Sequence, residues 1–214
     1  MKIPKIIHRI WISEERIPSQ YLEYGESWRF HHPDWTCLVW TQHNLPPMVN
    51  FDEFHDSLNV AQKADILRYE VLHAYGGLYV DMDFECLRPL EALVGTLECF
   101  VGEEEPGRIS NALIGCRAGH SFLRRLLHRL PGSIKRHANL WPPAQTGPRF
   151  FTACARIKGG WDPLITVFSP EVFYALERPG SKRGGADLSN AYGVHHGGGG
   201  WHRQLNDNFV PRRR

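Results

Sequence analysis

The sequence predicts an α/β fold, and three observations carry that prediction. Short β-branched runs alternate with amphipathic helical segments, as in folds that pack helices against a sheet. The clearest helix, over residues 59–75, ends at a Gly-Gly pair and is followed at once by an alternating strand. No internal repeat or low-complexity linker divides the chain, so its 214 residues are expected to form one domain over 1–214.

Each predicted element follows from a local pattern. β-branched or alternating runs predict strands at 5–12, 35–41, 78–84, 99–103, 111–116 and 164–168. Helices are predicted at 18–29, 59–75 and 121–130, after residue 147, and after Ser169 as its cap. Residues 146–148 read as a turn and 193–201 as a Gly-rich loop, while most of 131–160 shows no clear pattern.

Composition excludes several classes of protein. Lys and Arg number 25 against 23 Asp and Glu, so the net charge of +2 gives no strong field for nucleic acid. No apolar run approaches the roughly 20 residues that cross a bilayer, and Pro4, Lys5 and Arg9 interrupt any signal-like core, which predicts a cytoplasmic protein. The five cysteines form no C-x-x-C pair, which is typical of free thiols in a reducing compartment.

The helix over 59–75 carries the first chemically informative pair. Asn59 can cap this helix. Its core stripe is expected at Val60, Ala64, Leu67, Val71 and Ala74. Asp65 and Arg68 lie three residues apart, to one side of that stripe. A carboxylate and a guanidinium placed there can hold sugar hydroxyls, although an ordinary surface ion pair has the same spacing.

The strand over 78–84 carries the second group. Alternate side chains of a strand share a face, so Tyr79, Asp81, Asp83 and Glu85 are expected together, opposite an apolar face. Two carboxylates this close raise each other's pKa, and a divalent cation such as Mg²⁺ or Mn²⁺ relieves the repulsion. The motif alone is weak, because a solvated strand edge with Asp83 capping a turn has the same pattern.

Three blocks together resemble glycosyltransferase family 32, the Asp-x-Asp sugar-binding-region glycosyltransferases. The blocks are 4–11 (PKIIHRIW), 63–69 (KADILRY) and 75–83 (YGGLYVDMD). Shorter pieces follow in the family's order at 111–114, 146–148 and 195–201. The family includes capsular-polysaccharide and α-mannosyltransferase-type enzymes and, more distantly, the large clostridial glucosylating toxins.

The resemblance implies a GT-A type nucleotide-sugar-binding fold, with a mostly parallel central sheet flanked by helices. It also implies metal-dependent, retaining transfer of a hexose from a UDP- or GDP-sugar to a glycan or lipid-linked acceptor, with Mn²⁺ (or Mg²⁺) as cofactor. The expected partners are therefore a nucleotide sugar and its acceptor. Because the sequence offers no evident nucleophile on the β-face of the sugar, a front-face mechanism is the more economical hypothesis.

The catalytic assignments carry over to this sequence by position. The resemblance implies that Asp83 binds the metal directly and that Asp81 helps to bind it while touching the ribose and the donor sugar. It places the donor sugar against Asp65 and Arg68. It places Asn111 near the sugar and the acceptor.

Further residues are assigned to the nucleotide and the metal. Trp11 is implied to lie against the base, although a core position at a strand end fits equally well. Tyr79 is expected on the face of the acids. A His or acid near the end of these chains completes the metal shell or touches the diphosphate. We assign His195 to the metal and His196 to the nucleotide, although the sequence leaves that choice, and a plain surface pair, open.

From about residue 193 the chain is expected to be a flexible Gly-rich loop with a basic tail. Gly197–Gly200 depart from the family's Gly-Ser-Trp pattern before Trp201, so a hydroxyl ligand is missing there. Four glycines suit a lid that becomes ordered over bound donor.

The acceptor side is less well defined. The segment 141–143 and the basic side chains Arg124, Arg125 and Arg129 could face an anionic acceptor, but a plain surface explains them more simply. The same bases would support weak association with a membrane surface. Glu103–Glu105 is most simply a solvated charge run, and His8 and Arg9 are weak candidates near the nucleotide.

Two other functions would use the same acids. A metal-dependent phosphohydrolase needs a second metal cluster or a water-activating base, and the sequence has no second Asp/His-rich motif. A non-catalytic nucleotide-sugar or glycan-binding module would keep Asp65 and Arg68 as a sugar-binding pair but would not turn over a substrate. The intact acids argue against that alternative.

Overall fold

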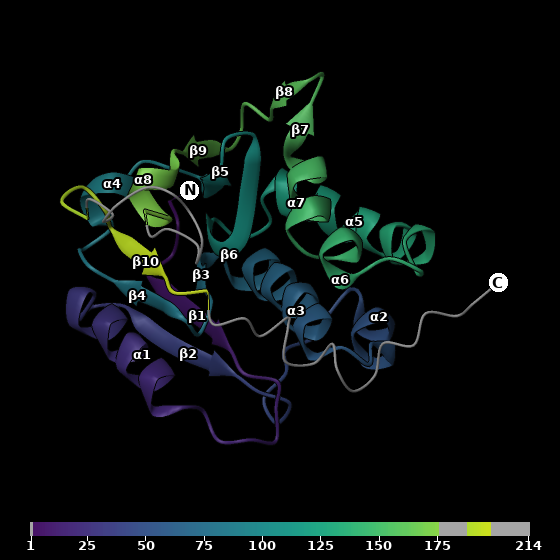
Figure 1. Cartoon of the computed structure of the whole chain (residues 1–214), viewed down its shortest axis with the longest axis horizontal. Coiled ribbons are helices and arrows are strands. Elements are labelled where there is room, and N and C mark those ends of the chain that lie inside the picture. Colours follow the sequence, from purple (N-terminus) through teal and green to yellow (C-terminus); the bar gives the residue numbers. More distant parts are fainter. Residues whose placement is uncertain (1, 176–187, 198–214) are drawn as a thin grey trace, which may run out of the picture.

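Six strands form the central sheet of the computed structural model, which describes residues 2–175 and 188–197 (Figure 1). In spatial order they are β2 (Thr36–Trp40), β1 (Ile6–Ile10), β3 (Gly77–Val80), β6 (Arg108–Cys116), β5 (Cys99–Glu105) and β9 (Thr166–Phe168). β6 is antiparallel to both neighbours, and the remaining pairs are parallel. The mostly parallel sheet is therefore confirmed.

Helices cover both faces of this sheet (Figure 1). One face packs against α3 (Val60–Tyr75), α5 (Ser121–Arg136) and α7 (Pro148–Ala155). The other face packs against α1 (Ser19–His31), α4 (Glu91–Val94) and α8 (Pro170–Phe173). The smaller elements are α2 (Phe51–Asp56), α6 (Pro142–Gln145), the hairpin of β7 (Arg156–Ile157) and β8 (Gly160–Trp161), and the pair of β4 (Phe84–Cys86) and β10 (Gly193–His195).

Helix α3 begins and ends where its sequence predicts. The Asn59 side chain caps it by accepting from the backbone N–H of Gln62 at 3.0 Å. Gly76 ends it at φ 65°, and a Cβ added there would lie 2.5 Å from the backbone nitrogen of Ala118. The predicted core stripe is wrong in one respect, because Ala74 is exposed. Residues 65–72 are all buried, since α3 packs against the sheet on one side and other helices around it.

The predicted strand over 78–84 is shorter than its alternating pattern suggests. β3 ends at Val80, and the residues that follow form a turn, closed by the Phe84 N–H donating to the Asp81 carbonyl at 3.1 Å. The predicted alternation holds, because Leu78 and Val80 pack into one core cluster and Tyr79 into the other, and every residue of β3 is buried. A central strand covered by helices on both faces has no solvated side.

The predicted loop over 193–201 begins as a strand. β10 pairs antiparallel with β4, and this pairing places His195 opposite Phe84. The unassigned segment 131–160 is largely helical, because α5 continues through Pro131 to Arg136 and is followed by α6 and α7. α8 begins after Ser169, although the serine side chain makes no capping hydrogen bond.

His8 is a core residue of β1 and has no place near a nucleotide. Its side chain is fully buried, its Nε2 lies 2.8 Å from the Gly76 carbonyl oxygen, and its Nδ1 accepts from the Trp40 indole N–H at 3.0 Å. A proton added to Nδ1 would face that indole donor. Burial, only partly offset by the bond to Gly76, lowers the pKa of His8 to about 4.

The stability of the fold is expected to fall as His8 is forced to bind a proton. The unfolded chain takes up this proton near pH 6.5 and the folded chain only near pH 4, so stability is complete above pH 6.5 and is lost between these values. From pH 7 to pH 5 the expected loss is about 2 kcal/mol. Urea unfolding of the wild type and His8→Gln at both pH values measures it. Equal losses in the two proteins would contradict this role for His8.

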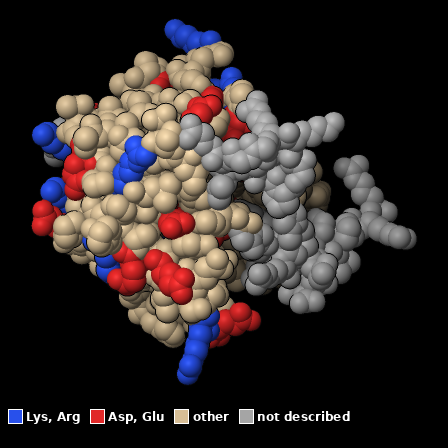
Figure 2. Space-filling model, turned by 60° about the vertical axis from the view of Figure 1, so that its left-hand side comes forward, with Lys and Arg blue, Asp and Glu red and all other residues tan. Residues whose placement is uncertain are grey.

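The described surface in view in Figure 2 has no single dominant charge. On the face shown in Figure 2, acidic and basic side chains are interspersed, in keeping with the net charge of +2. Within the described ranges, no helix has both the length and the hydropathy that a bilayer span requires.

Candidate active site

The candidate site lies where β3 ends in the sheet. Asp81 directly follows the last residue of β3, and its N–H still donates to the Ala112 carbonyl of β6 at 2.8 Å. Because β6 is antiparallel to β3, its early residue Asn111 reaches this same edge. Ligands of open α/β sheets bind beyond the carboxyl ends of the parallel strands, which is where these residues lie.

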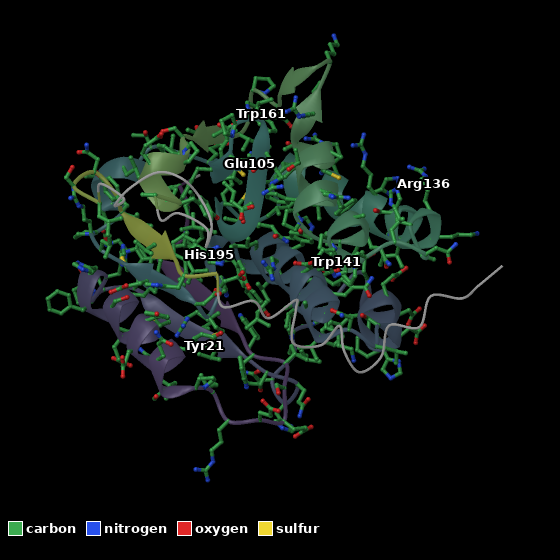
Figure 3. The ribbon with its side chains drawn as sticks, in the orientation of Figure 1. Tyr21, Glu105, Arg136, Trp141, Trp161 and His195 are labelled. Atoms are coloured by element: carbon green, nitrogen blue, oxygen red, sulfur yellow. The ribbon has the colours of Figure 1, made fainter. Side chains whose placement is uncertain are left out.

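Three side chains from two segments of the chain converge at this edge. The His195 Nε2 lies 3.2 Å from an oxygen of Asp83 and 3.8 Å from Oδ2 of Asp81, and all three donor atoms lie within 4.8 Å of one another. Their side chains are 16% to 25% exposed, so a ligand can reach them. Figure 3 shows His195 near the centre of the molecule, with Trp161 and Arg136 far toward its edges. The pairing of β10 with β4 brings His195 here.

Arg68 fixes the other oxygen of Asp81. Its Nη1 lies 3.0 Å from Oδ1 of Asp81 and donates to the Asn111 carbonyl at 2.8 Å. The Tyr79 hydroxyl donates to the same Oδ1 at 2.6 Å, and the guanidinium lies over the Tyr79 ring at 4.5 Å. Burial alone would lower the pKa of Arg68, but the charges of Asp81 and Asp65 and the neighbouring tyrosines together raise it. Oδ1 is thereby held by protein groups while Oδ2 faces His195.

Asp65 is the fully buried acid of this network. Its carboxylate is fully buried and accepts from the Asn111 amide at 2.7 Å and from the Thr146 hydroxyl at 2.8 Å, with Arg68 Nη2 at 3.3 Å. The Asn111 amide also donates to the Tyr69 hydroxyl at 2.8 Å. Burial raises the pKa of Asp65 to about 6, against the opposing effects of Arg68 and both hydrogen bonds.

The structure shows which protein groups Asp65 and Arg68 contact. Both are buried, at 0% and 4% exposed, and they bind each other, Asp81 and Asn111. They orient the acid that faces the ligand. Direct contact with a sugar stays a prediction for these two residues.

The electrostatics of the three converging groups suit a cation. Burial raises the pKa of Asp81, and the neighbouring charge of Asp83 adds to that effect. Burial would lower the pKa of His195, but its hydrogen bond to Asp83 and the charges of both acids raise it instead. Two carboxylates and one imidazole form a ligand set that Mn²⁺ accepts, with nitrogen favouring Mn²⁺ over Mg²⁺. The residues present thus fit a divalent ion.

Arg9 contacts the turn that carries the acids, although the sequence marked it only as a weak candidate. Its guanidinium is buried and donates from Nη2 to the carbonyl of Met82, between the two acids, at 2.7 Å and to that of Tyr21 at 2.8 Å. Gly25 makes room for it, because an added Cβ would lie 2.1 Å from Arg9 Nη1. A charged residue within the apolar strand β1 was the available signal. It indicates a buried partner, which here is the turn that carries the acids.

Substitution of Gly25 by Ala is expected to displace Arg9 and loosen this turn. The overpacking should cost about 1–3 kcal/mol of stability, and Mn²⁺ affinity should fall about tenfold. Gly132→Ala is the matched control, because Gly132 is also helical and an added Cβ there meets nothing within 4 Å. Urea unfolding and a Mn²⁺ titration check both effects. If the two variants behave alike, Arg9 does not position the turn.

The remaining predicted residues lie around this centre. Trp11 donates to the Glu15 carbonyl at 2.8 Å and packs edge-on against Tyr21, through which it joins the contacts of Arg9. The side chain of His196 contacts Tyr24 and Glu85. Its ring stacks on Tyr24 with 4.4 Å between the ring centroids, and its Nε2 lies 2.9 Å from Glu85 Oε2. A direct contact of Trp11 or His196 with a nucleotide stays a prediction.

Several weaker candidates take part in other contacts. Glu104 and Glu105 pair with Arg108 in a hairpin, and Arg125 pairs with Asp162. The predicted lid beyond Gly197, Trp201 and the basic tail lie outside the described residues.

The fold defines the class first: it is the GT-A fold of glycosyltransferases. The PaToxG glycosyltransferase has a similar structure, with a TM-score of 0.59 at 18% identity over 71% of this chain and 68% of that one. The catalytic domain of alpha-toxin from Clostridium novyi superposes with a TM-score of 0.53 at 12% identity, over 64% of this chain and 59% of that domain. These likenesses concern the fold alone.

The sequence comparisons then confirm the resemblance that the motifs carry. Residues 18–100 match the family described as glycosyltransferase sugar-binding region containing DXD motif. Inositol phosphoceramide mannosyltransferase 1 of Schizosaccharomyces pombe is 30% identical over 71% of this chain and 50% of its own length. The chain spans about half or less of the length of the first curated relatives it matches.

Proposed function

We propose that this chain is a metal-dependent, retaining glycosyltransferase that moves a hexose from a nucleoside diphosphate sugar to a hydroxyl acceptor. One observation carries the proposal. Asp81, Asp83 and His195 converge beyond the end of β3, and Arg68 holds Asp81 in place from the buried side. Such an arrangement presents fixed, ligand-accessible oxygen and nitrogen atoms at the edge where α/β sheets bind nucleotides.

Oδ2 of Asp81, the carboxylate of Asp83 and Nε2 of His195 would hold the ion, with Mn²⁺ favoured over Mg²⁺. When bound, a divalent ion stabilises the negative charge that grows on a departing diphosphate. The protein must supply the ion with two ionised acids and a neutral imidazole. Because the pKa values of Asp81 and His195 are raised, the ligand set is expected to weaken as the pH falls.

The chain's own contribution is preorganisation of this edge. Asp65, Arg68 and Asn111 form a buried network in which each polar group is paired, so Asp81 is oriented before substrate binds. Arg9 holds the turn between the acids from the opposite side. Fixed dipoles and charges of this kind need no rearrangement at the moment of reaction, which is how they lower its barrier.

Retention of anomeric configuration is the finer part of the proposal, and the family resemblance supports it. A proton NMR spectrum of the product, recorded before mutarotation, measures the configuration directly. A product with the same anomeric configuration as the donor is expected. A product of inverted configuration would contradict the retaining mechanism but not the proposed glycosyltransferase activity.

The choice of substrate follows the relatives. The similar protein from Schizosaccharomyces pombe is named an inositol phosphoceramide mannosyltransferase, which makes mannosyl transfer to a glycan or lipid-linked hydroxyl the first hypothesis for this chain. The competing phosphohydrolase gains no support. Within the described ranges, the other group of potential metal ligands consists of two cysteines and a histidine, which does not suit the hard cation of a second phosphate-binding site.

A panel of UDP- and GDP-hexoses with Mn²⁺ tests the proposal, read as slow hydrolysis of the donor so that no acceptor is needed. One donor should be cleaved well above the others, and EDTA should abolish the cleavage. Cleavage that survives EDTA, or equal cleavage of every donor, would contradict it. A nucleoside monophosphate and a sugar phosphate as the products would indicate the phosphohydrolase instead.

A further inference from the structure

A second cluster of chemistry-bearing side chains lies at the other end of the sheet. Cys99, Cys116 and His120 are buried, and their sulfur and nitrogen atoms lie within 4.8 Å of one another. Cys116 pairs with Gly77, the first residue of β3, whereas Asp81 follows the last. The cluster is therefore separate from the candidate active site by the length of that strand.

The two cysteines occupy a position that suits a covalent link. They are direct partners across the antiparallel strands β5 and β6, and the next pair outward is hydrogen-bonded, with the Arg117 N–H donating to the Glu98 carbonyl at 2.8 Å. Because such pairs alternate along a ladder, Cys99 and Cys116 form a non-hydrogen-bonded pair, with Cα atoms about 4.5 Å apart. That spacing falls within the roughly 4.4–6.8 Å that a disulfide spans.

His120 completes the cluster as a proton donor. It is the N-cap of α5, and its Nδ1 accepts from the backbone N–H of Phe122 at 3.3 Å. The ring proton must then be on Nε2, the nitrogen left to donate to the sulfur of Cys116. This tautomer disfavours a metal ion at the cluster. A metal ligand must offer a free lone pair, and the nitrogen in question carries a proton instead.

The surroundings favour a thiolate at Cys116. Burial alone would raise the pKa of the Cys116 thiol, but hydrogen bonds from Cys99 and His120, with the positive charge of Arg117, lower it instead. Burial raises the pKa of Cys99, and its hydrogen bond to Cys116 and the charges of Cys116 and Asp162 add to that effect. One thiol is thus prepared to react, and its neighbour holds the proton.

We propose that Cys116 and Cys99 form a peroxide-reactive dithiol that closes to a disulfide. The Cys116 thiolate attacks one oxygen of hydrogen peroxide and becomes a sulfenic acid, while hydroxide leaves. Cys99, having given its proton to that hydroxide, attacks the sulfenic sulfur. The hydroxyl group of the sulfenic acid leaves as water, taking up from solvent the proton that the Cys116 thiol released when it ionised. In total, two thiols and one peroxide give one disulfide and two waters, with two electrons passing from sulfur to oxygen.

Both thiols are buried, so hydrogen peroxide must reach them through a local opening. Cys99 is the first residue of β5 and Cys116 is the last of β6, which places the pair at the end of this ladder, where such openings are easiest. Hydrogen peroxide is small enough to enter such an opening. Cys37 offers an internal comparison, because it is the thiol with more exposure, but burial raises its pKa against the opposing charges of Arg29 and Arg9.

Peptide mapping of the reduced full-length chain during peroxide treatment tests the proposal. We expect the Cys99–Cys116 disulfide to appear before any oxidation of Cys37. In Cys99→Ser the reaction should stop at a Cys116 sulfenic acid, which dimedone traps. In His120→Asn, which keeps an oxygen to cap α5 but loses the imidazole donor, closure should slow about tenfold.

Other outcomes would overturn it. Prior oxidation of Cys37, or no Cys99–Cys116 peptide in the wild type, would show that exposure alone governs these thiols, and this readout needs no variant to fold. Zinc or copper bound stoichiometrically to the purified wild type, and lost from Cys116→Ser, would identify the cluster as a metal site instead.

Discussion

Asp83→Asn is expected to reduce Mn²⁺-dependent donor cleavage by at least about 100-fold, because a bound metal contributes several kcal/mol to departure of a diphosphate. The variant preserves the shape of the side chain and removes a charge that lies 3.2 Å from Nε2 of His195. Donor cleavage and Mn²⁺ affinity should fall together. Urea unfolding should show that the protein remains folded.

Glu85→Gln is the matched control for that substitution. Glu85 is also an acid of the same short segment, but it binds His196 at 2.9 Å, away from the other acids. Its loss should leave Mn²⁺ affinity within about twofold of the wild type, as expected for an exposed ion pair. If Asp83→Asn and Glu85→Gln have equal effects, Asp83 has no special part in holding the ion.

The second large effect is expected from Arg68→Met. The change removes the guanidinium that lies between Asp65 and Asp81, and it leaves the fully buried carboxylate of Asp65 without a counter-charge. Breaking a buried ion pair in this way costs about 3–5 kcal/mol of stability. Because Asp81 also loses the group that orients it, Mn²⁺ affinity should fall as well. Urea unfolding and a Mn²⁺ titration measure the two losses.

Arg29→Met provides the comparison on another helix. Arg29 pairs with Glu26 at the same three-residue spacing, but both side chains are at least half exposed. Surface pairs of this kind contribute little, so a small change in stability is expected. Arg68→Lys, which keeps the charge but loses the planar fork, should fall between the two. A loss at Arg68 no larger than that at Arg29 would contradict the buried network.

Much of this fold could be predicted from local sequence patterns. Asn59 and Gly76 mark the ends of α3 because capping and the left-handed conformation depend on single residues and their immediate neighbours. The burial of α3 could not be read in the same way. Its residues 65–72 are enclosed by elements distant in the sequence, so an amphipathic stripe describes it incompletely.

In the candidate site too, local features could be predicted and tertiary contacts could not. Asp81 and Asp83 stand out in the sequence, but their convergence with His195 depends on β10 pairing with β4, which no local pattern predicts in a glycine-rich segment. Spacing on α3 placed Asp65 and Arg68 on one face, and only the tertiary structure shows that this face is buried against Asn111 and Asp81. The contact of Arg9 with Met82 likewise joins segments far apart in the chain.

The central claim is that Asp81, Asp83 and His195 hold an ion that binds a diphosphate. Anomalous diffraction from crystals of the chain grown with Mn²⁺ and a nucleoside diphosphate tests it most directly. We expect a manganese peak in contact with both acids and with Nε2 of His195, adjoining the phosphates. A nucleotide bound with no manganese among these three side chains would contradict the account, as would manganese bound at a different place.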